Sequence, residues 1–87
     1  MEVIYKCNLI ILWANEWFNK RKGNKKHFDT SFVESVSNYY DNHNTITKTQ
    51  NDALDNIIDK WNIESWLDNH CVRNNLNKNE VIKYLRI

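Results

Sequence analysis

Apolar residues recur along this chain at the three- and four-residue spacing of amphipathic α-helices. The spacing predicts five helical segments, over residues 2–21, 30–42, 48–61, 64–72 and 78–86. No repeat, low-complexity stretch or composition shift divides the chain. The pattern therefore predicts an all-α fold, a compact bundle of four to five short helices, in a single helical domain over residues 1–87.

Capping signals support these boundaries. Three capping residues are followed three positions later by Glu or Gln, at Ser31–Glu34, Thr47–Gln50 and Asn77–Glu80. Asp29 is an alternative cap for the second segment. In such a capping box the two residues satisfy backbone N–H groups that a helix start leaves without partners. The chain has one glycine and no proline, so breaks such as residues 42–44 depend on asparagine, which tolerates the left-handed conformation.

The first segment is apolar on two faces. One stripe runs through Val3, Cys7, Ile10, Ile11, Ala14, Trp17 and Phe18, and the other side carries Tyr5, Leu9, Leu12 and Trp13. Such a helix is either central in its own domain or buries one face in a partner, for instance in a homodimer. An alternative makes residues 2–7 a short N-terminal strand of an α+β fold, because Val, Ile and Tyr favour strands.

Composition points to the coding genome. Asn, Lys, Ile, Tyr and Phe, which have AT-rich codons, supply 40 residues, whereas Gly, Ala, Pro and Arg supply 6. This bias is typical of some phages, large DNA viruses and low-GC bacteria. Two distant cysteines favour a reduced compartment. Without a signal peptide or a membrane-length apolar run, we expect a cytoplasmic protein, in the host cytoplasm if phage-encoded, with no membrane partner.

A basic loop over residues 20–27 is one candidate site. Its cations are Lys20, Arg21, Lys22, Lys25 and Lys26. Such a cluster can neutralise phosphates and make binding salt-dependent. The alternative is a helix end followed by a solvated loop. The formal net charge of +1 and the pI of about 7.8 are low for a dedicated DNA-binding domain, which usually exceeds ~9.

A second candidate is an acidic ridge formed by Asp52, Asp55 and Asp59, whose spacing places them along one helix face. It could meet a basic surface on a protein partner, or it could be an ordinary solvated face. Trp13, off the main stripe of its helix, is a further partner-binding candidate, because exposed Trp is enriched at binding hot spots. Its alternative is burial in a central helix.

The cysteines and histidines form no recognisable catalytic or metal motif. His70 and Cys71 are adjacent, and no pair has the spacing of zinc ligands. A dyad of Cys7 with His70 stays open, although Cys7 lies on the apolar stripe, where thiols are usually inert. We therefore expect no catalytic residue, no metal and no cofactor.

The middle of the chain resembles small phage-encoded helical modules across residues 28–61. The resemblance lies in three runs: Phe32-Val33-Glu34-Ser35, Ile46-Thr47-Lys48-Thr49-Gln50 and Ala53-Leu54-Asp55-Asn56-Ile57. The glycine usual before the hydrophobic-Thr pair is replaced here by Asn42-His43-Asn44. The resemblance implies a helical module of phage or mobile-element origin, and no particular activity.

These observations favour a small, non-enzymatic phage or mobile-element protein that binds and blocks a host macromolecule. An anti-CRISPR or anti-restriction inhibitor is one concrete form. One alternative is a nucleic-acid-binding module that uses the loop at residues 20–27. Another is a structural subunit that folds within a larger assembly.

Overall fold

The computed structural model describes residues 2–21 and 27–85. Its helices are α1 (Val3–Glu16), the 3₁₀ turn η1 (Phe18–Lys20), α2 (Ser31–His43), α3 (Lys48–Lys60), α4 (Ile63–Arg73) and α5 (Lys78–Leu85). The described residues contain no strand, which confirms the all-α prediction. The alternative strand over residues 2–7 is wrong, since helical backbone begins at Val3. No described helix is both long and apolar enough to cross a bilayer.

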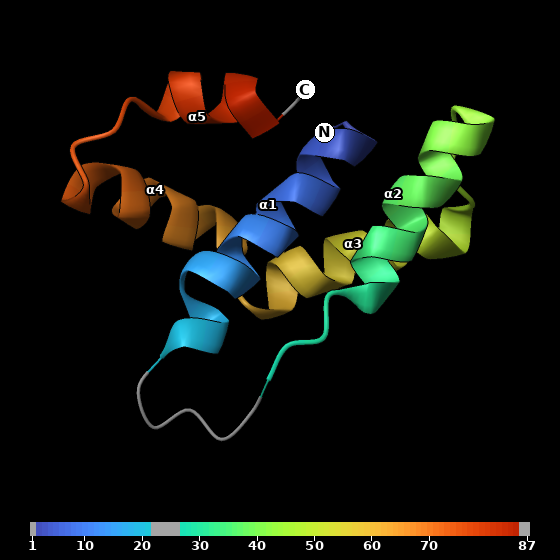
Figure 1. Cartoon of the computed structure of the whole chain (residues 1–87), viewed down its shortest axis with the longest axis horizontal. Helices are drawn as coiled ribbons and strands as arrows, with labels where there is room; N and C mark the ends of the chain where they lie inside the picture. The colour runs from blue at the N-terminus through green and yellow to red at the C-terminus, as the bar shows by residue number, and fades with distance from the viewer. Residues whose placement is uncertain (1, 22–26, 86–87) are drawn as a thin grey trace.

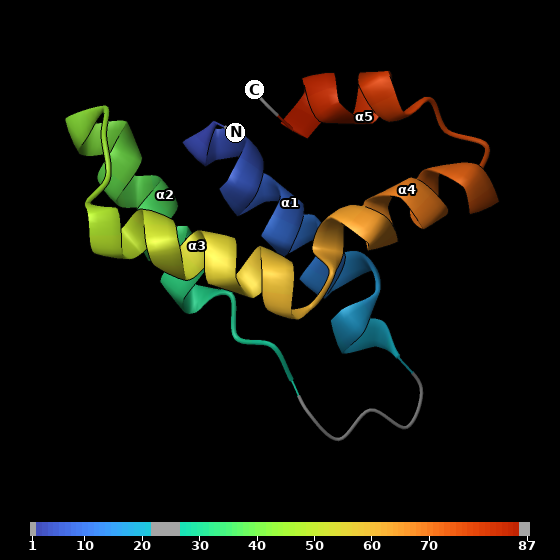
Figure 2. The same cartoon turned by 180° about the vertical axis from the view of Figure 1, so that it is seen from behind.

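Helix α1 is the centre of the fold, as Figure 1 shows, and packs against α2, α3, α4 and α5. Helix α3 crosses behind α1 in Figure 1 and in front of it in the reverse view of Figure 2. This placement explains why the sequence of α1 is apolar on two faces. Of the two expectations for this helix, the central position within its own domain is the one observed.

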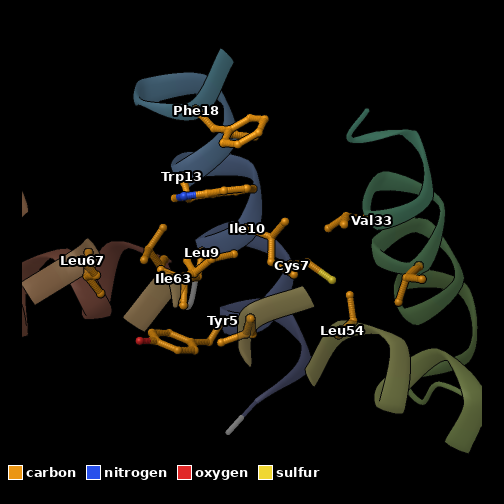
Figure 3. Close-up of a cluster of buried hydrophobic side chains, with 14 of the residues drawn as sticks. Tyr5, Cys7, Leu9, Ile10, Trp13, Phe18, Val33, Leu54, Ile63 and Leu67 are labelled. Carbon is orange, nitrogen blue, oxygen red and sulfur yellow. The ribbon is translucent and has the colours of Figure 1, made fainter. Parts of the chain in front are cut away.

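The buried side chains form a cluster around α1 (Figure 3). It joins apolar residues of every helix, among them Cys7, Leu9, Ile10, Val33, Leu54, Ile63, Leu67 and Leu85. At the C-terminal end of α1 the cluster becomes aromatic. The Trp13 ring centroid lies 4.8 Å from Phe18, 5.1 Å from Phe28 and 5.8 Å from Trp61. We call these four residues the aromatic cluster.

The first helix is shorter than the sequence pattern predicts. Helix α1 stops at Glu16 rather than continuing to residue 21, and Trp17 follows it with φ −136° and ψ −63°, outside helical geometry. Trp17 therefore leaves the register that would have placed it on the apolar stripe. Its exposure is 37%, so the prediction of a core Trp17 is wrong.

The three predicted capping boxes have different outcomes. The box at Thr47 is confirmed: Gln50 N donates to Thr47 Oγ1 at 3.1 Å, and Thr47 N donates to Gln50 Oε1 at 2.9 Å. Asn77 Oδ1 accepts hydrogen bonds from the first turn of α5, from Asn79 N at 2.9 Å and Glu80 N at 3.4 Å. The prediction of a capping box at Ser31 is wrong, because Thr30 is the N-cap residue and makes no side-chain cap hydrogen bond.

At α2 the interaction is made by the alternative cap, Asp29, two residues before Ser31. The Ser31 amide donates to Asp29 Oδ1 at 2.9 Å, and Thr30 occupies the N-cap position. The pKa of the exposed Asp29 is lowered, mainly because its carboxylate accepts hydrogen bonds from Ser31. The preceding aspartate thus takes the role that the pattern assigned to the serine.

Asparagine replaces glycine at the breaks between helices. Asn44, Asn62 and Asn75 have φ of 57°, 52° and 55°, in the left-handed region that Asn tolerates better than most residues. After α4, the Leu76 amide donates to the Cys71 carbonyl and the Asn75 amide to the Val72 carbonyl. This is a Schellman-type ending with Asn in the usual glycine position. The left-handed conformation expected at residues 42–44 is thereby confirmed at Asn44.

Candidate binding groove

A groove lies beside the aromatic cluster, between the residues that end α1 and helix α4. Its volume is about 570 Å³, within the ~300–1,000 Å³ range typical of ligand sites. It is lined by Glu16, Trp17, Trp61, Asn62, Ser65, Trp66, Asn69, His70, Arg73 and Asn74. We call this site the tryptophan groove, because three of the four tryptophans of the chain line it.

Each tryptophan of the groove has a basic side chain against its ring. The guanidinium carbon of Arg21 lies 4.7 Å from the Trp17 ring centroid, and Lys60 Nζ lies 5.2 Å from that of Trp61. The His70 imidazole stacks on Trp66 with centroids 4.7 Å apart and an interplanar angle of 22°. A cation over an indole face is attracted by the negative face of the ring. The groove therefore combines aromatic surface with positive charge.

Helix α4 supplies one wall of the groove through a single stripe. Ser65, Trp66, Asn69, His70 and Arg73 follow one another at spacings of one, three or four residues, which keeps them on one side of a helix. The opposite stripe of α4 buries Ile63, Leu67 and Cys71 in the core. The helix is thus held by its apolar side while its aromatic and polar side faces the groove.

Beside the other wall, the Asn19 side chain forms two hydrogen bonds with the backbone of Phe28. The Asn19 side chain donates to the Phe28 carbonyl at 3.1 Å and accepts from the Phe28 amide at 2.8 Å. This pair of bonds ties together the two ends of the loop that carries the predicted basic cluster. Lys20 and Arg21 therefore follow a residue, Asn19, that these hydrogen bonds hold in place. Lys22, Lys25 and Lys26 lie outside the described residues.

Acidic charge at the groove is limited and partly neutralised. Glu16 is the carboxylate among the lining residues, and its Oε2 lies 3.5 Å from Lys20 Nζ. Arg73 lines the opposite wall. Among the lining residues Glu16 and Arg73 carry opposite charges, and Lys20 and Arg21 add positive charge beside Trp17.

The three carboxylates of the predicted acidic ridge lie on α3, and one of them pairs with α1. Asp55 Oδ1 lies 2.7 Å from the ammonium of Lys6, which is 6% exposed and also donates to Asn51 Oδ1 at 2.8 Å. Asp55 is thus a partner of α1, because it stands at the edge of α3 that turns toward the core. Asp52 and Asp59 are exposed, and Asp52 lies 3.7 Å from Lys48.

Trp13 is not a surface residue. Its exposure is 0%, because α1 is central and the face carrying Trp13 packs against Phe28 and Trp61. The prediction of a partner contact at Trp13 is therefore corrected to a core position. Its indole N–H has no hydrogen-bond partner within residues 2–21 and 27–85.

The cysteines lie in the core. Burial, and secondarily the charge of Asp41, raises the pKa of Cys7 to about 11, so its thiol is protonated at neutral pH. Cys71 is 3% exposed. His43 stacks on Tyr39 with centroids 4.0 Å apart, and its Nδ1 lies 2.9 Å from the Tyr39 carbonyl. Within the described ranges, no group of three or more His, Cys, Asp or Glu is arranged to hold a metal ion.

A second cavity of about 400 Å³ lies between α1 and α5. It is lined by Asn8, Ile11, Leu12, Asn15, Tyr84 and Leu85. Tyr84 is 76% exposed, while the Asn8 side chain donates to the Leu85 carbonyl at 2.6 Å and ties the two helices together. This face of α1 is where a homodimer through the first helix would have to form.

The sequence patterns missed Trp66, His70 and Arg73 as site residues. One signal could have identified two of them, since the four-residue spacing of Trp66 and His70 allows their rings to stack on one side of a helix. The wall built by Trp17 could not have been found in this way, because its exposure depends on where α1 ends.

No known protein family, curated protein or solved structure matches the chain. The function has to be inferred from the residues and geometry of the chain itself.

Proposed function

We propose that this chain is a non-enzymatic binding protein that acts by occupying the surface of another macromolecule, and that the tryptophan groove is its binding surface. The observation that carries the proposal is the contrast between Trp17, 37% exposed, and the buried rings of Trp13 and Phe18 in the aromatic cluster beside it. Partly exposed Trp and Arg side chains are the residues most enriched at binding hot spots. The groove presents both types on a wall anchored in the core.

The state of the cysteines supports a binding role over nucleophilic catalysis. The reactive form of a cysteine is the thiolate. A pKa of about 11 for Cys7 leaves roughly one thiol in ten thousand ionised at pH 7. His70, the partner considered for Cys7, is stacked on Trp66 in the groove wall.

The AT-rich coding bias and the resemblance across residues 28–61 support a phage or mobile-element origin. In that setting a small binding protein commonly works by blocking a host component. Antagonism of a host defence, as by an anti-CRISPR or anti-restriction inhibitor, is the concrete form we propose, acting in the host cytoplasm.

The exposed carboxylates Asp52 and Asp59 favour a second candidate surface. Seven residues separate them, so they lie nearly above one another along α3. They could meet a basic groove of a protein partner, where complementary charge mainly raises the association rate and the specificity. This surface shares no residue with the tryptophan groove.

Affinity capture with matched variants distinguishes the two surfaces. The tagged chain, Trp17→Ala, and the double variant Asp52→Asn with Asp59→Asn are incubated with bacterial lysate, with and without nuclease. We expect the bound partner to be lost with Trp17→Ala and kept with the double variant. The reverse result would move the binding surface to α3. Retention of the partner by both variants would reject both surfaces.

A further inference from the structure

We infer that the tryptophan groove binds single-stranded nucleic acid, with bases stacked on its indole rings and phosphates held by the basic side chains beside them. This inference rests on the proposed function, because it names the ligand of the same groove. It differs from recognition by the basic loop alone, which would need no aromatic surface.

The aromatic part of the inference comes from the three rings. Proteins that bind single strands without sequence preference stack successive bases on aromatic side chains, since every base has a π-face. Trp17, Trp61 and Trp66 line one groove from two walls. Trp17 is the most accessible of them, because the other two are only partly exposed.

The basic partners strengthen the case for a nucleic acid over an apolar peptide. Arg21, Lys60 and His70 already lie against the three rings. A planar guanidinium or imidazole offers a stacking surface to a base, and a cation near the ring can also pair with the adjoining phosphate. A purely apolar ligand would gain nothing from the charges of Arg21 and Lys60 and would have to desolvate them.

The backbone of the strand has its own binding groups. Arg73 lines one wall, and Lys20 and Arg21 follow Trp17 on the other. Glu16 opposes an anion, but its carboxylate is already close to Lys20. Ser65 and Asn69 of the same α4 stripe offer hydroxyl and amide groups to the edges of unpaired bases.

The position of the rings requires an unpaired strand. Trp61 and Trp66 line the groove and are half-buried, so a base must leave its own stack to reach them. In a duplex the base faces are covered by neighbouring pairs, and only the groove edges and phosphates are available. We therefore expect single strands to bind much more tightly than a duplex of equal charge.

The test uses fluorescence anisotropy with labelled dT₁₂ and rU₁₂ and with a hairpin duplex of matched phosphate number. We expect both single strands to bind and the hairpin to bind at least roughly tenfold more weakly. Affinity should fall with salt at a log–log slope of about −2, as three phosphate contacts at about 0.7 each predict. A hairpin that binds as tightly as the single strands overturns the inference.

Variants assign the binding to the groove. Trp17→Ala should weaken single-strand binding roughly 5- to 100-fold, the range for loss of one stacked base. Trp17→Phe should restore most of the affinity, because the phenyl ring still stacks. The matched aromatic control is Tyr84→Ala, on the exposed side of α5. Binding by Trp17→Ala equal to that of the unmodified chain overturns the inference.

Arg73→Gln should reduce the salt slope by about 0.7, the share of one phosphate contact with a single strand. Lys48→Gln, an exposed cation on α3, is its control and should leave the slope unchanged. An unchanged slope for Arg73→Gln contradicts the assigned phosphate contact and overturns that part of the inference.

The outcome also separates this inference from the proposed function. If no oligonucleotide binds at 50 mM salt, yet Trp17→Ala still abolishes capture of a nuclease-resistant partner, the ligand class is wrong and the groove remains a protein-binding site. If Trp17→Ala changes neither oligonucleotide binding nor capture, both are rejected.

Discussion

Trp13 and Trp17 are four residues apart, and the apolar pattern assigns Trp17 to the main stripe of the first helix and Trp13 to its other side. The aromatic cluster buries Trp13 completely, whereas Trp17 lines the open groove at 37% exposure. The difference arises from the end of α1 at Glu16, which turns Trp17 out of the helical register. The position of a helix end can therefore decide whether an aromatic residue serves the core or the surface.

The two regions meet at Trp61. Its ring lies 5.8 Å from Trp13 and 5.1 Å from Phe18 on the inner side, and it also lines the groove. The aromatic cluster thus forms the support on which the groove is built. A rigid support matters for binding, because a surface that is already ordered loses less conformational entropy when its ligand binds.

The largest effect is expected from removing the inner tryptophan. Trp13→Ala should lower the free energy of unfolding by about 3–5 kcal/mol, since it deletes a fully buried ring and leaves a cavity. A domain of this size has only ~4–13 kcal/mol of stability in total. Urea denaturation followed by circular dichroism measures the change.

Trp13→Phe is the control for this prediction. It keeps an aromatic ring and removes an indole N–H that has no hydrogen-bond partner among the described residues, a group whose burial costs free energy. We expect it to cost clearly less than Trp13→Ala. Alkylation of Cys7 by iodoacetamide at pH 8 provides a second measurement, because the buried thiol should react slowly in the native chain and fast in Trp13→Ala. Equal urea midpoints for Trp13→Ala and the unmodified chain would show that the cluster is not the support of the fold.

Two aspartates of α3, Asp55 and Asp52, give the same contrast between a buried and an exposed interaction. Asp55→Ala should cost about 1–3 kcal/mol, because it leaves the buried ammonium of Lys6 without its carboxylate. The Asp55 side chain is 45% exposed, which keeps the value below that of a fully buried pair. Asp52→Ala, whose ion pair with Lys48 is exposed, should change stability by less than about 0.5 kcal/mol.

A double-mutant cycle with Lys6→Met sharpens this comparison. The Met side chain has similar length and no charge, so Asp55→Ala should cost much less in that background. If Asp55→Ala costs the same with Lys6 and with Met, the ion pair does not couple α1 to α3.

The starts of α3 and α2, at Thr47 and Ser31, offer a smaller version of the contrast. Thr47→Ala should lower stability by about 1 kcal/mol, since both hydrogen bonds of its capping box are formed. Ser31→Ala should have almost no effect, because its side chain makes no cap and Asp29 serves that helix. Thermal unfolding of both variants checks the prediction. A larger loss for Ser31→Ala would restore the capping box that the pattern predicted.

The periodic parts of the fold could be predicted from the sequence, and the parts that depend on helix ends could not. Helices α3, α4 and α5 begin and end within about two residues of their predicted bounds, since the apolar spacing and the caps at Thr47 and Asn77 agree. The end of α1 has no such signal. Trp17 and Phe18 continue the apolar pattern beyond the last helical residue, so the periodicity extended the helix too far.

For the same reason, the residues of the candidate site could be predicted only in part. Lys20 and Arg21 were identified from their charge, and they do adjoin the groove. For Trp13 the alternative of burial in a central helix is the one observed, and Asp55 pairs with Lys6 of α1, because the sequence pattern alone does not reveal which neighbours each helix face meets. Only the packing of α1 in the centre of the fold determines which side of each helix stays exposed.

The sharpest test of the comparison, with a small expected effect on stability, comes from the outer tryptophan. Trp17→Ala should cost only about 0.5–1 kcal/mol, the value of an exposed cation–π contact such as that with Arg21. Parallel urea titrations of Trp13→Ala and Trp17→Ala measure the difference directly. A cost of 3 kcal/mol or more for Trp17→Ala would mean that this ring holds the core together, and the reduced binding of the variant would then report unfolding. A small cost leaves the ring with exposed aromatic surface that the fold does not need, and such surface is what a binding site requires.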